Sequence, residues 1–385
     1  MLKVSTPSAA PALDQGGNGY PYSSIWINGR HVSIEKILQD REESRTSFED
    51  SVFSFLKQWL TGEQNFQVTT SGSTGKPKPI VISRSQMIIS ARRTAERIGL
   101  QNDIRALVCI DPRYIGGKMM LARCLSVGLR IMAIDPVANP LLRIPVDKCV
   151  QFTAFVPYQI HSILESKHPH LLNNLDSVLI GGAPLSESSR KQLDRFQCRC
   201  YETYGMTETV SHIALRLANT PGKQPYFETL PGIDISLDER GCLVIEADYL
   251  REPVITNDLV EMTGPGKFIW SGRWDNVINT GGIKVSPEKI EKELEAIFYR
   301  NNFTHRFFIA ALPDERLGSK VVLILEGVQF SSELLERSLA QFRSAVSPYE
   351  FPKEVYSVPE FLHTESKKID RIQTLPAITL LSPLK

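Results

Sequence analysis

The stretch from Thr69 to Pro79 brings together hydroxyl groups, glycines and lysines at a density that suits the binding of a polyphosphate. Glycines let backbone N–H groups turn toward an anion, Ser and Thr add hydroxyl donors, and Lys76 and Lys78 add positive charge. The spacing is not that of a nucleotide-hydrolysing P-loop, because Pro77 follows Lys76 where that motif has Ser or Thr. The alternative interpretation is a flexible linker, which Ser/Gly-rich runs often form.

Two further segments have the composition of ligand-binding loops. Gly181-Gly182-Ala183-Pro184 directly follows an apolar run that ends at Ile180, and Tyr204-Gly205-Met206-Thr207-Glu208-Thr209 follows another short apolar run. Glycine permits a backbone to approach a ligand closely. Taken singly, the first segment is equally compatible with a plain turn and the second with a plain helix start.

These loops need a scaffold, and the apolar pattern around them predicts one. Apolar runs that alternate with helical patterns lie at Arg105–Ile110, Leu129–Ile134, Phe152–Val156 and Ser177–Ile180. Short buried strands separated by helices indicate an α/β fold with a mostly parallel sheet that is covered by helices on both faces. Ligands of such sheets bind at the carboxyl ends of the strands, where the glycine-rich loops fall. The apolar segments 66–68 and 80–82 predict two more strands, so the phosphate-binding stretch should connect a hairpin.

The pattern also divides the chain into two domains. Ser83 stands where a helix N-cap is expected, and Gly99 stands near the end of the same helix. Beyond Leu230 the alternation of strands and helices gives way to short strands and turns. From Gly272 onward, strands again alternate with helices, over a length sufficient for a small α+β domain. We therefore expect a large N-terminal domain over residues 1–272 and a small domain over residues 273–385.

The composition excludes several other functions. The chain has 385 residues, with 44 Lys and Arg against 43 Asp and Glu, and a net charge of +1. A balanced charge gives no field that would attract nucleic acid or an anionic membrane. The six cysteines show no metal-binding spacing, and no apolar run approaches the length of a membrane span. We therefore expect a cytoplasmic protein with buried free thiols; the sequence gives no signal for an oligomeric state.

Taken together, these segments resemble the adenylate-forming superfamily of acyl-CoA synthetases, nonribosomal-peptide adenylation domains and luciferases. The similar segments follow the superfamily's order along the chain; they are T-S-G-S-T-G-x-P-K at 70–78, Y-G-M-T-E at 204–208, T-N-D at 256–258, G-R-x-D at 272–275, G-G-I-K-V-S-P-E-K-I-E at 281–291 and T-E-S-K-K-I-D-R at 364–371. Three positions depart from the usual glycine, namely Pro79, Asn257 and Lys367. Only 69 residues precede the phosphate loop, which implies a shortened N-terminal subdomain.

The resemblance implies a ligase that uses ATP, Mg²⁺ and CoA to activate a small carboxylic acid. The substrate carboxylate attacks the α-phosphorus of ATP and needs no general base, because its pKa is about 4 and it is already ionised. The residues implied are Thr70, Ser71, Gly72, Ser73, Thr74, Gly75 and Lys78 for the β- and γ-phosphates, Gly181, Gly182, Ala183 and Pro184 for the adenine, Tyr204 and Gly205 within the nucleotide site, Thr207 for the α-phosphate, Glu208 for Mg²⁺, and Asp258 with Arg273 for the ribose. Asp258 taken alone would instead be a turn residue, because Asn-Asp is a common turn pair.

The same resemblance gives roles to residues of the small domain. Lys368 is implied as the catalytic lysine, although a lysine in a Lys-Lys pair near a C-terminus is usually solvated. Asp275 matches the residue about which the small domain rotates between the two half-reactions. Gly281 and Gly282 would then leave a narrow passage for the pantetheine arm of CoA.

Within the superfamily, the short chain and the segments at 114–120 and 206–213 look most like the 2-succinylbenzoate–CoA ligases of menaquinone biosynthesis. Tyr114, Gly116, Ser211 and His212 would then lie in the acid pocket, although His212 beside apolar residues could equally be structural. Two alternatives stay open: a ligase for another acid or for a carrier-protein thiol, and an inactive nucleotide-binding protein.

Overall fold

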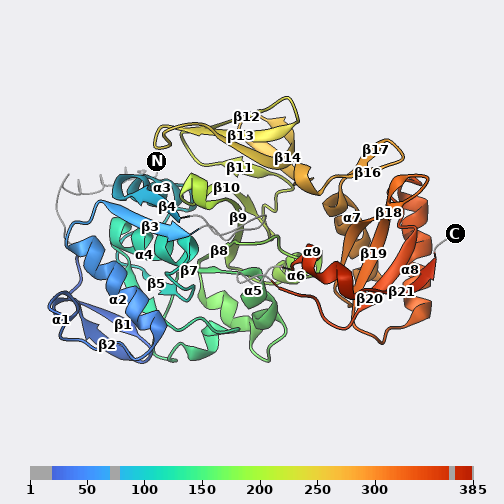
Figure 1. The fold of residues 1–385 in the computed structure, drawn as a ribbon. Coiled ribbons are helices and arrows are strands. Elements are labelled where there is room, and N and C mark those ends of the chain that lie inside the picture. The colour runs from blue at the N-terminus through green and yellow to red at the C-terminus, as the bar shows by residue number, and fades with distance from the viewer. Residues whose placement is uncertain (1–19, 70–78, 364–368, 384–385) are drawn as a thin grey trace, which may run out of the picture.

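The computed structural model describes residues 20–69, 79–363 and 369–383. The large domain is built on a 13-stranded sheet (Figure 1). From one edge to the other its strands are β12 (Ile233–Leu237), β13 (Cys242–Ala247), β14 (Val254–Gly264), β15 (Lys267–Arg273), β11 (Phe227–Thr229), β10 (His212–Leu217), β9 (Arg199–Gly205), β8 (Ser177–Ile180), β7 (Phe152–Phe155), β5 (Arg105–Val108), β6 (Arg130–Ala133), β1 (Ser24–Ile27) and β2 (Arg30–Ser33).

The central strands β9, β8, β7, β5, β6 and β1 run parallel. Alternate residues of β5 enter two different apolar clusters: Ala106 and Val108 join one, and Leu107 joins the other. Because successive side chains of a strand point to opposite faces, both faces of this part of the sheet are buried. The helices of the large domain are α1 (Ile34–Leu38), α2 (Ser47–Leu60), α3 (Arg84–Ile98), α4 (Ile115–Val127), α5 (Pro157–Leu164) and α6 (Glu187–Leu193). The predicted helix-covered parallel sheet is confirmed.

From β10 to β15 the sheet continues with antiparallel strands, so the sheet as a whole is mixed. β14 is 11 residues long, and the sequence pattern did not predict it. Its residues Thr256, Asn257 and Asp258 are polar and resemble a turn, yet Thr256 and Asp258 are buried. Tertiary contacts here override the local preference for a turn.

Antiparallel strands β3 (Asn65–Thr69) and β4 (Pro79–Ser83) flank residues 70–78. The two flanking strands are therefore confirmed, whereas residues 70–78, which the sequence analysis expects to bind phosphate, lie outside the described residues. Ser83 ends β4 and caps α3: its hydroxyl accepts from the backbone N–H of Gln86, whose side chain accepts from the backbone N–H of Ser83. Gly99 ends the helix in a left-handed conformation, as the sequence predicted.

The small domain has a sheet of its own, in the order β18 (Phe307–Asp314), β19 (Gly318–Glu326), β20 (Glu354–Val358) and β21 (Thr379–Pro383). Helices α7 (Pro287–Arg300) and α8 (Ser332–Ala345) share one apolar cluster with β19, while the hairpin of β16 (Ile278–Thr280) and β17 (Ile283–Val285) and the short helix α9 (Arg371–Thr374) complete the domain. The large sheet ends with β15 at Arg273, and the 3₁₀ turn η4 (Trp274–Asn276) leads to β16.

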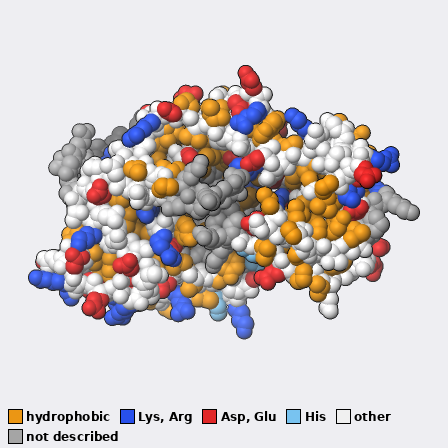
Figure 2. Space-filling view, in the orientation of Figure 1, with side chains coloured by type: hydrophobic (Ala, Val, Ile, Leu, Met, Phe, Trp, Pro, Cys, Tyr) orange, Lys and Arg blue, Asp and Glu red, His pale blue; other side chains and the backbone are white. Residues whose placement is uncertain are grey.

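In the view of Figure 2, acidic and basic side chains are interspersed, whereas hydrophobic side chains gather on the small domain. The exposed large apolar side chains of that domain include Leu362, Ile372 and Leu380. No helix among the described residues is long and apolar enough to cross a membrane.

Candidate active site

The two glycine-containing loops leave the same edge of the sheet. β8 and β9 are parallel neighbours, and Ile180 is paired with Glu202. The loop Gly181–Pro184 therefore begins beside the end of β9, which carries Tyr204 and Gly205 and continues into the 3₁₀ turn η3 (Thr207–Thr209). Within η3, Thr207 is buried and Glu208 is exposed. The sequence thus predicted correctly that these two segments lie together at the carboxyl ends of the strands.

Steric contacts explain the glycine at two of these positions. A Cβ atom on Gly181 would stand 2.3 Å from the hydroxyl oxygen of Thr203, and one on Gly205 would stand 2.4 Å from the Cα atom of His212. Real Cβ atoms essentially never approach that closely. The backbone at Gly181 thus passes directly over β9, and β9 packs closely against the start of β10.

Asp258 lies at the centre of a polar cluster that joins three strands. Its carboxylate accepts hydrogen bonds from the Tyr204 hydroxyl at 2.6 Å and from the Trp270 indole N–H at 3.2 Å. The Arg273 guanidinium lies 3.8 Å away. Burial and the neighbouring Asp258 carboxylate raise the pKa of Tyr204 above its usual value, so the phenol stays protonated and acts as a donor. The cluster holds a carboxylate, the acceptor that a ribose diol requires, at a fixed place near the end of β9.

Arg273 also connects this cluster to the junction between the domains. Its Nε and Nη2 atoms donate to the two carboxylate oxygens of Asp275 at 2.8 and 2.7 Å. This bidentate pair lowers the pKa of Asp275, which therefore stays ionised at neutral pH. One guanidinium thus lies between Asp258, in the large sheet, and Asp275, in the segment that leads to the small domain.

A second polar group lies between α3, α4 and β10. The Nε2 atom of His212 is 2.9 Å from the Thr94 hydroxyl, which itself donates to the Ser90 carbonyl at 3.0 Å. Since the Thr94 proton is engaged, Nε2 carries the imidazole proton. Burial, together with the positive charge of Arg123, holds the pKa of His212 well below its usual value, so the ring is neutral.

Arg123 is the feature of this site that the sequence analysis missed. Its side chain is 2% exposed, and Nη1 contacts only the Met120 sulfur at 3.4 Å. The Nε atom has no hydrogen-bond partner, and no carboxylate within the described part of the chain forms an ion pair with this guanidinium. Burial lowers the pKa of Arg123 to about 10, so the side chain still carries its charge at neutral pH. A single arginine in the apolar run from Met119 to Leu125 was the available signal.

The backbone between Glu208 and His212 is strained. Val210 is buried and has φ 70° and ψ −46°, a conformation that β-branched residues rarely adopt. The Thr209 hydroxyl stabilises the turn, because it donates to the Ser211 carbonyl at 2.8 Å and accepts from the Met206 N–H at 3.0 Å. A strained conformation of this kind persists only where the surrounding structure holds the chain in place. Here the surroundings hold the turn that lies between the Asp258 cluster and the His212 group.

Other expected site residues lie elsewhere. Tyr114 is exposed and precedes α4, whose first turn contains Gly116, two helical turns before Arg123. Gly281 and Gly282 form the turn of the β16–β17 hairpin, with φ of 60° and 81°, so that turn itself requires glycine. Lys368 lies outside the described residues, as do Thr70, Ser71, Gly72, Ser73, Thr74, Gly75 and Lys78.

Comparison with known proteins agrees with this architecture. The sequence profile of the AMP-binding enzyme family matches residues 31–243, more than half of the chain. The 2-succinylbenzoate–CoA ligase of Lactococcus lactis is 23% identical over 322 residues, which are 79% of this chain and 69% of that protein. The corresponding Salmonella typhimurium ligase is 24% identical and covers 83% of this chain and 70% of that protein.

Solved structures show the same fold. The crystal structure of an acyl-CoA synthetase (AMP-forming)/AMP-acid ligase II-like protein from Dyadobacter fermentans is 39% identical, with a TM-score of 0.58, and the match covers 88% of this chain and 97% of that one. O-succinylbenzoate coenzyme A synthetase from Bacillus subtilis, solved with ATP and magnesium ion, has a TM-score of 0.68 at 18% identity and covers 89% of this chain and 82% of that one. The chain therefore belongs to the AMP-binding enzyme family, within the superfamily of adenylate-forming acyl-CoA ligases.

Proposed function

We propose that this chain activates 2-succinylbenzoate as an acyl-adenylate and transfers the acyl group to CoA, as a step of menaquinone biosynthesis. The observation that supports this acid is the buried cation of Arg123, which forms no ion pair with any carboxylate of the described residues. 2-Succinylbenzoate carries two carboxylates, and when one of them reacts with ATP the other stays ionised. Burying an isolated charge is costly unless an opposite charge accompanies it, so a buried guanidinium beside a neutral histidine suits the second carboxylate.

The polar cluster around Asp258 supports the nucleotide half of the proposal. Asp258 would accept hydrogen bonds from the ribose hydroxyls with Arg273 beside it, and Gly181 to Pro184 would pass along the adenine. Thr207 would contact the α-phosphate. Glu208 would supply one Mg²⁺ ligand, since the described residues contain no group of three or more His, Cys, Asp or Glu that could hold a metal by itself. Mg²⁺ characteristically takes one or two carboxylates together with substrate phosphates.

In the first half-reaction the substrate carboxylate forms a bond to the α-phosphorus, and the bond to pyrophosphate breaks. Positioning and charge neutralisation are the requirements, and we propose Lys368 as the mobile cation for this step. In the second half-reaction the CoA thiol attacks the adenylate carbonyl, AMP leaves, and the thiol loses its proton. We propose that the small domain, residues 273–385, rotates about Asp275 between the two steps and that Gly281 and Gly282 then line the pantetheine passage.

The test compares two acids that differ by one carboxylate. 3-Benzoylpropionate has the keto-acid side chain of 2-succinylbenzoate but no ring carboxylate. With ATP, Mg²⁺ and CoA, we expect the wild-type chain to form the 2-succinylbenzoyl thioester and to prefer 2-succinylbenzoate in kcat/KM. Arg123→Leu should lower kcat/KM for 2-succinylbenzoate by about 100-fold, because removing one partner of a buried charge pair costs about 2–5 kcal/mol. The monocarboxylate should be affected far less.

Other outcomes separate the alternatives. Equal losses for both acids would show that Arg123 does not recognise the second carboxylate. AMP release with a different acid in a panel, or acylation of a carrier-protein thiol in place of CoA, would identify another ligase of the superfamily. Absence of AMP release with every acid, despite ATP binding, would support an inactive nucleotide-binding protein.

A further inference from the structure

Helix α7 lies between the two domains and presents a different face to each. Ile290, Leu294 and Ile297 recur at helical spacing and are buried in the core of the small domain. A second stripe contains Glu291, Glu295 and Tyr299, spaced four residues apart, so these side chains follow one another along one side of the helix. The helix packs against both α6 and β15 of the large domain.

Two residues of this stripe contact α6. The carboxylate of Glu295 lies close to the backbone N–H of Glu187 and to the Arg190 guanidinium; burial raises its pKa, and both of these groups oppose that rise. One turn further along α7, the ring of Tyr299 lies under the Lys191 ammonium, whose nitrogen is 4.7 Å from the ring centroid. The two contacts are independent, since one places a carboxylate near the start of α6 and the other is a cation–π interaction.

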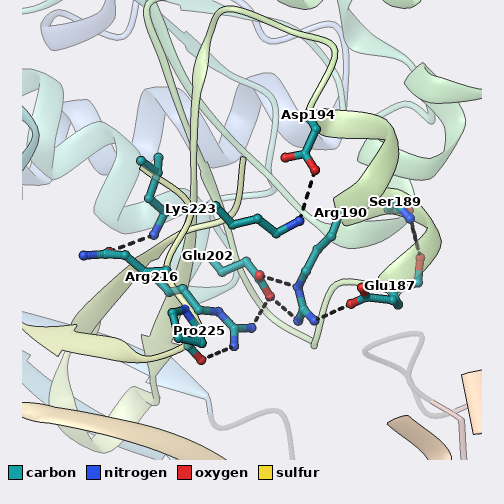
Figure 3. Close-up of polar contacts among 11 residues, drawn as sticks. Glu187, Ser189, Arg190, Asp194, Glu202, Arg216, Lys223 and Pro225 are labelled. Atoms are coloured by element: carbon teal, nitrogen blue, oxygen red, sulfur yellow. Dashed lines mark hydrogen bonds and ion pairs between the residues drawn. The ribbon is translucent and has the colours of Figure 1, made fainter. Parts of the chain in front are cut away.

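The part of α6 that they contact is fixed to the active-site strand. Figure 3 shows Glu202 of β9 between Arg190 of α6 and Arg216 of β10. Arg190 donates to both carboxylate oxygens of Glu202, at 2.7 and 2.8 Å, and Arg216 donates to one of them at 2.9 Å. Glu202 is buried and lies two residues before Tyr204. Because α6 also follows the loop Gly181–Pro184, its contacts with α7 connect the small domain to the elements that carry the proposed nucleotide site.

The same face of α7 holds the segment that follows Lys368. Glu291, one turn before Glu295, accepts two hydrogen bonds from Arg371, at 2.8 and 2.9 Å. Figure 1 shows α9, which begins at Arg371, on the side of the small domain that faces the large domain. One helix turn of α7 thus separates Glu295, which lies near α6, from Glu291, which binds Arg371 three residues after Lys368.

We propose that Glu295 and Tyr299 form a latch on α6 that holds the small domain in the orientation for adenylation, and that the latch opens before the thioester step. The assignment to half-reactions rests on the proposed function, whereas the latch itself rests on the contacts of α7. Glu295 and Tyr299 are positioning residues: they act through the orientation of α7 and touch no reacting atom.

The first test measures domain orientation without any substrate. Cys149 is exposed on the large domain and the other five cysteines are buried, so a dye pair attaches to Cys149 and to Ser344→Cys on the exposed side of α8. Loss of one polar contact should shift the docking equilibrium by about fivefold, equivalent to about 1 kcal/mol, so Glu295→Ala should broaden the distribution of transfer efficiencies. Glu295→Gln keeps an acceptor and should restore the wild-type distribution.

Control variants show whether a change in the distribution comes from the loss of the Glu295 and Tyr299 contacts. Glu293→Ala removes a carboxylate from the same helix two residues away, on another side, and should leave the distribution unchanged. Tyr299→Ala should broaden it, whereas Tyr299→Phe keeps the aromatic ring and should not. An unchanged distribution in both Glu295→Ala and Tyr299→Ala would overturn the latch, whether or not the chain proves to be a ligase.

The second test separates the half-reactions. We expect Glu295→Ala to slow acyl-adenylate formation by up to about fivefold, in line with the expected shift in docking, and to leave thioester formation from supplied acyl-adenylate and CoA equal or faster. Glu295→Gln should behave as wild type in both steps. A loss confined to the thioester step would overturn the assignment of the latched orientation to adenylation.

Discussion

Burial of Arg123 makes the free energy of folding less favourable, and the same residue has a role in the proposed site. A buried guanidinium without a carboxylate partner among the described residues opposes folding, since part of its desolvation is not offset. We therefore expect Arg123→Met to raise the free energy of unfolding of the ligand-free protein by about 1–3 kcal/mol, although it lowers activity with 2-succinylbenzoate. Chemical denaturation monitored by circular dichroism measures the change.

The neighbouring Met119→Leu provides the comparison for that experiment. Met119 is equally buried in α4, and a volume-conserving exchange there should change the free energy of unfolding by less than about 1.5 kcal/mol. If Arg123→Met destabilises the protein instead, the guanidinium has partners that stabilise the folded state, and its availability for a substrate carboxylate is disproved.

At the scale of elements, the loop after β8 owes its place to close packing against β9. The hydroxyl of Thr203 donates to the Ile180 carbonyl at 3.2 Å and occupies the space that a Cβ atom on Gly181 would need. Gly181→Ala should therefore displace the loop and raise KM for ATP by about tenfold, because small displacements of binding groups cost this much or more.

A second substitution tests whether the clash is the cause. Thr203→Ala removes the hydroxyl, and the remaining Cβ atom of residue 203 lies 3.6 Å from the added methyl group, an ordinary contact. The double variant Gly181→Ala/Thr203→Ala should recover most of the affinity for ATP. The steric explanation fails if the double variant binds ATP as weakly as Gly181→Ala alone.

At the scale of the whole molecule, the proposed function gives the small domain a different placement in each half-reaction, with the junction at Asp275 as the proposed hinge. Proline fixes φ near −65° and also restricts Trp274, so Asp275→Pro should obstruct rotation. We expect adenylation, measured by ATP–pyrophosphate exchange, to persist while thioester formation fails. Asp275→Ala is the control, because it removes the bidentate partner of Arg273 without stiffening the backbone. Equal loss of both steps in Asp275→Pro would indicate general damage.

The local pattern of the sequence was sufficient for much of the architecture. The parallel strands, the hairpin around residues 70–78 and the capping box of Ser83 depend on side chains close together in the chain, so periodicity and cap residues predict them. The order of motifs that resemble the adenylate-forming superfamily likewise predicted the fold class and the two loops at the carboxyl edge.

The tertiary structure alone decided which polar residues are buried and with which partners. Asp258 resembles a turn residue in the sequence, but strand β14 brings it to Tyr204, 54 residues away, and His212 meets Thr94 from 118 residues away. In the sequence Arg123 looks like an ordinary helix residue, and its burial results from the packing of α4 against α3 and β10. Burial and electrostatic environment depend on which distant segments pack together, and the sequence pattern around a residue does not contain that information.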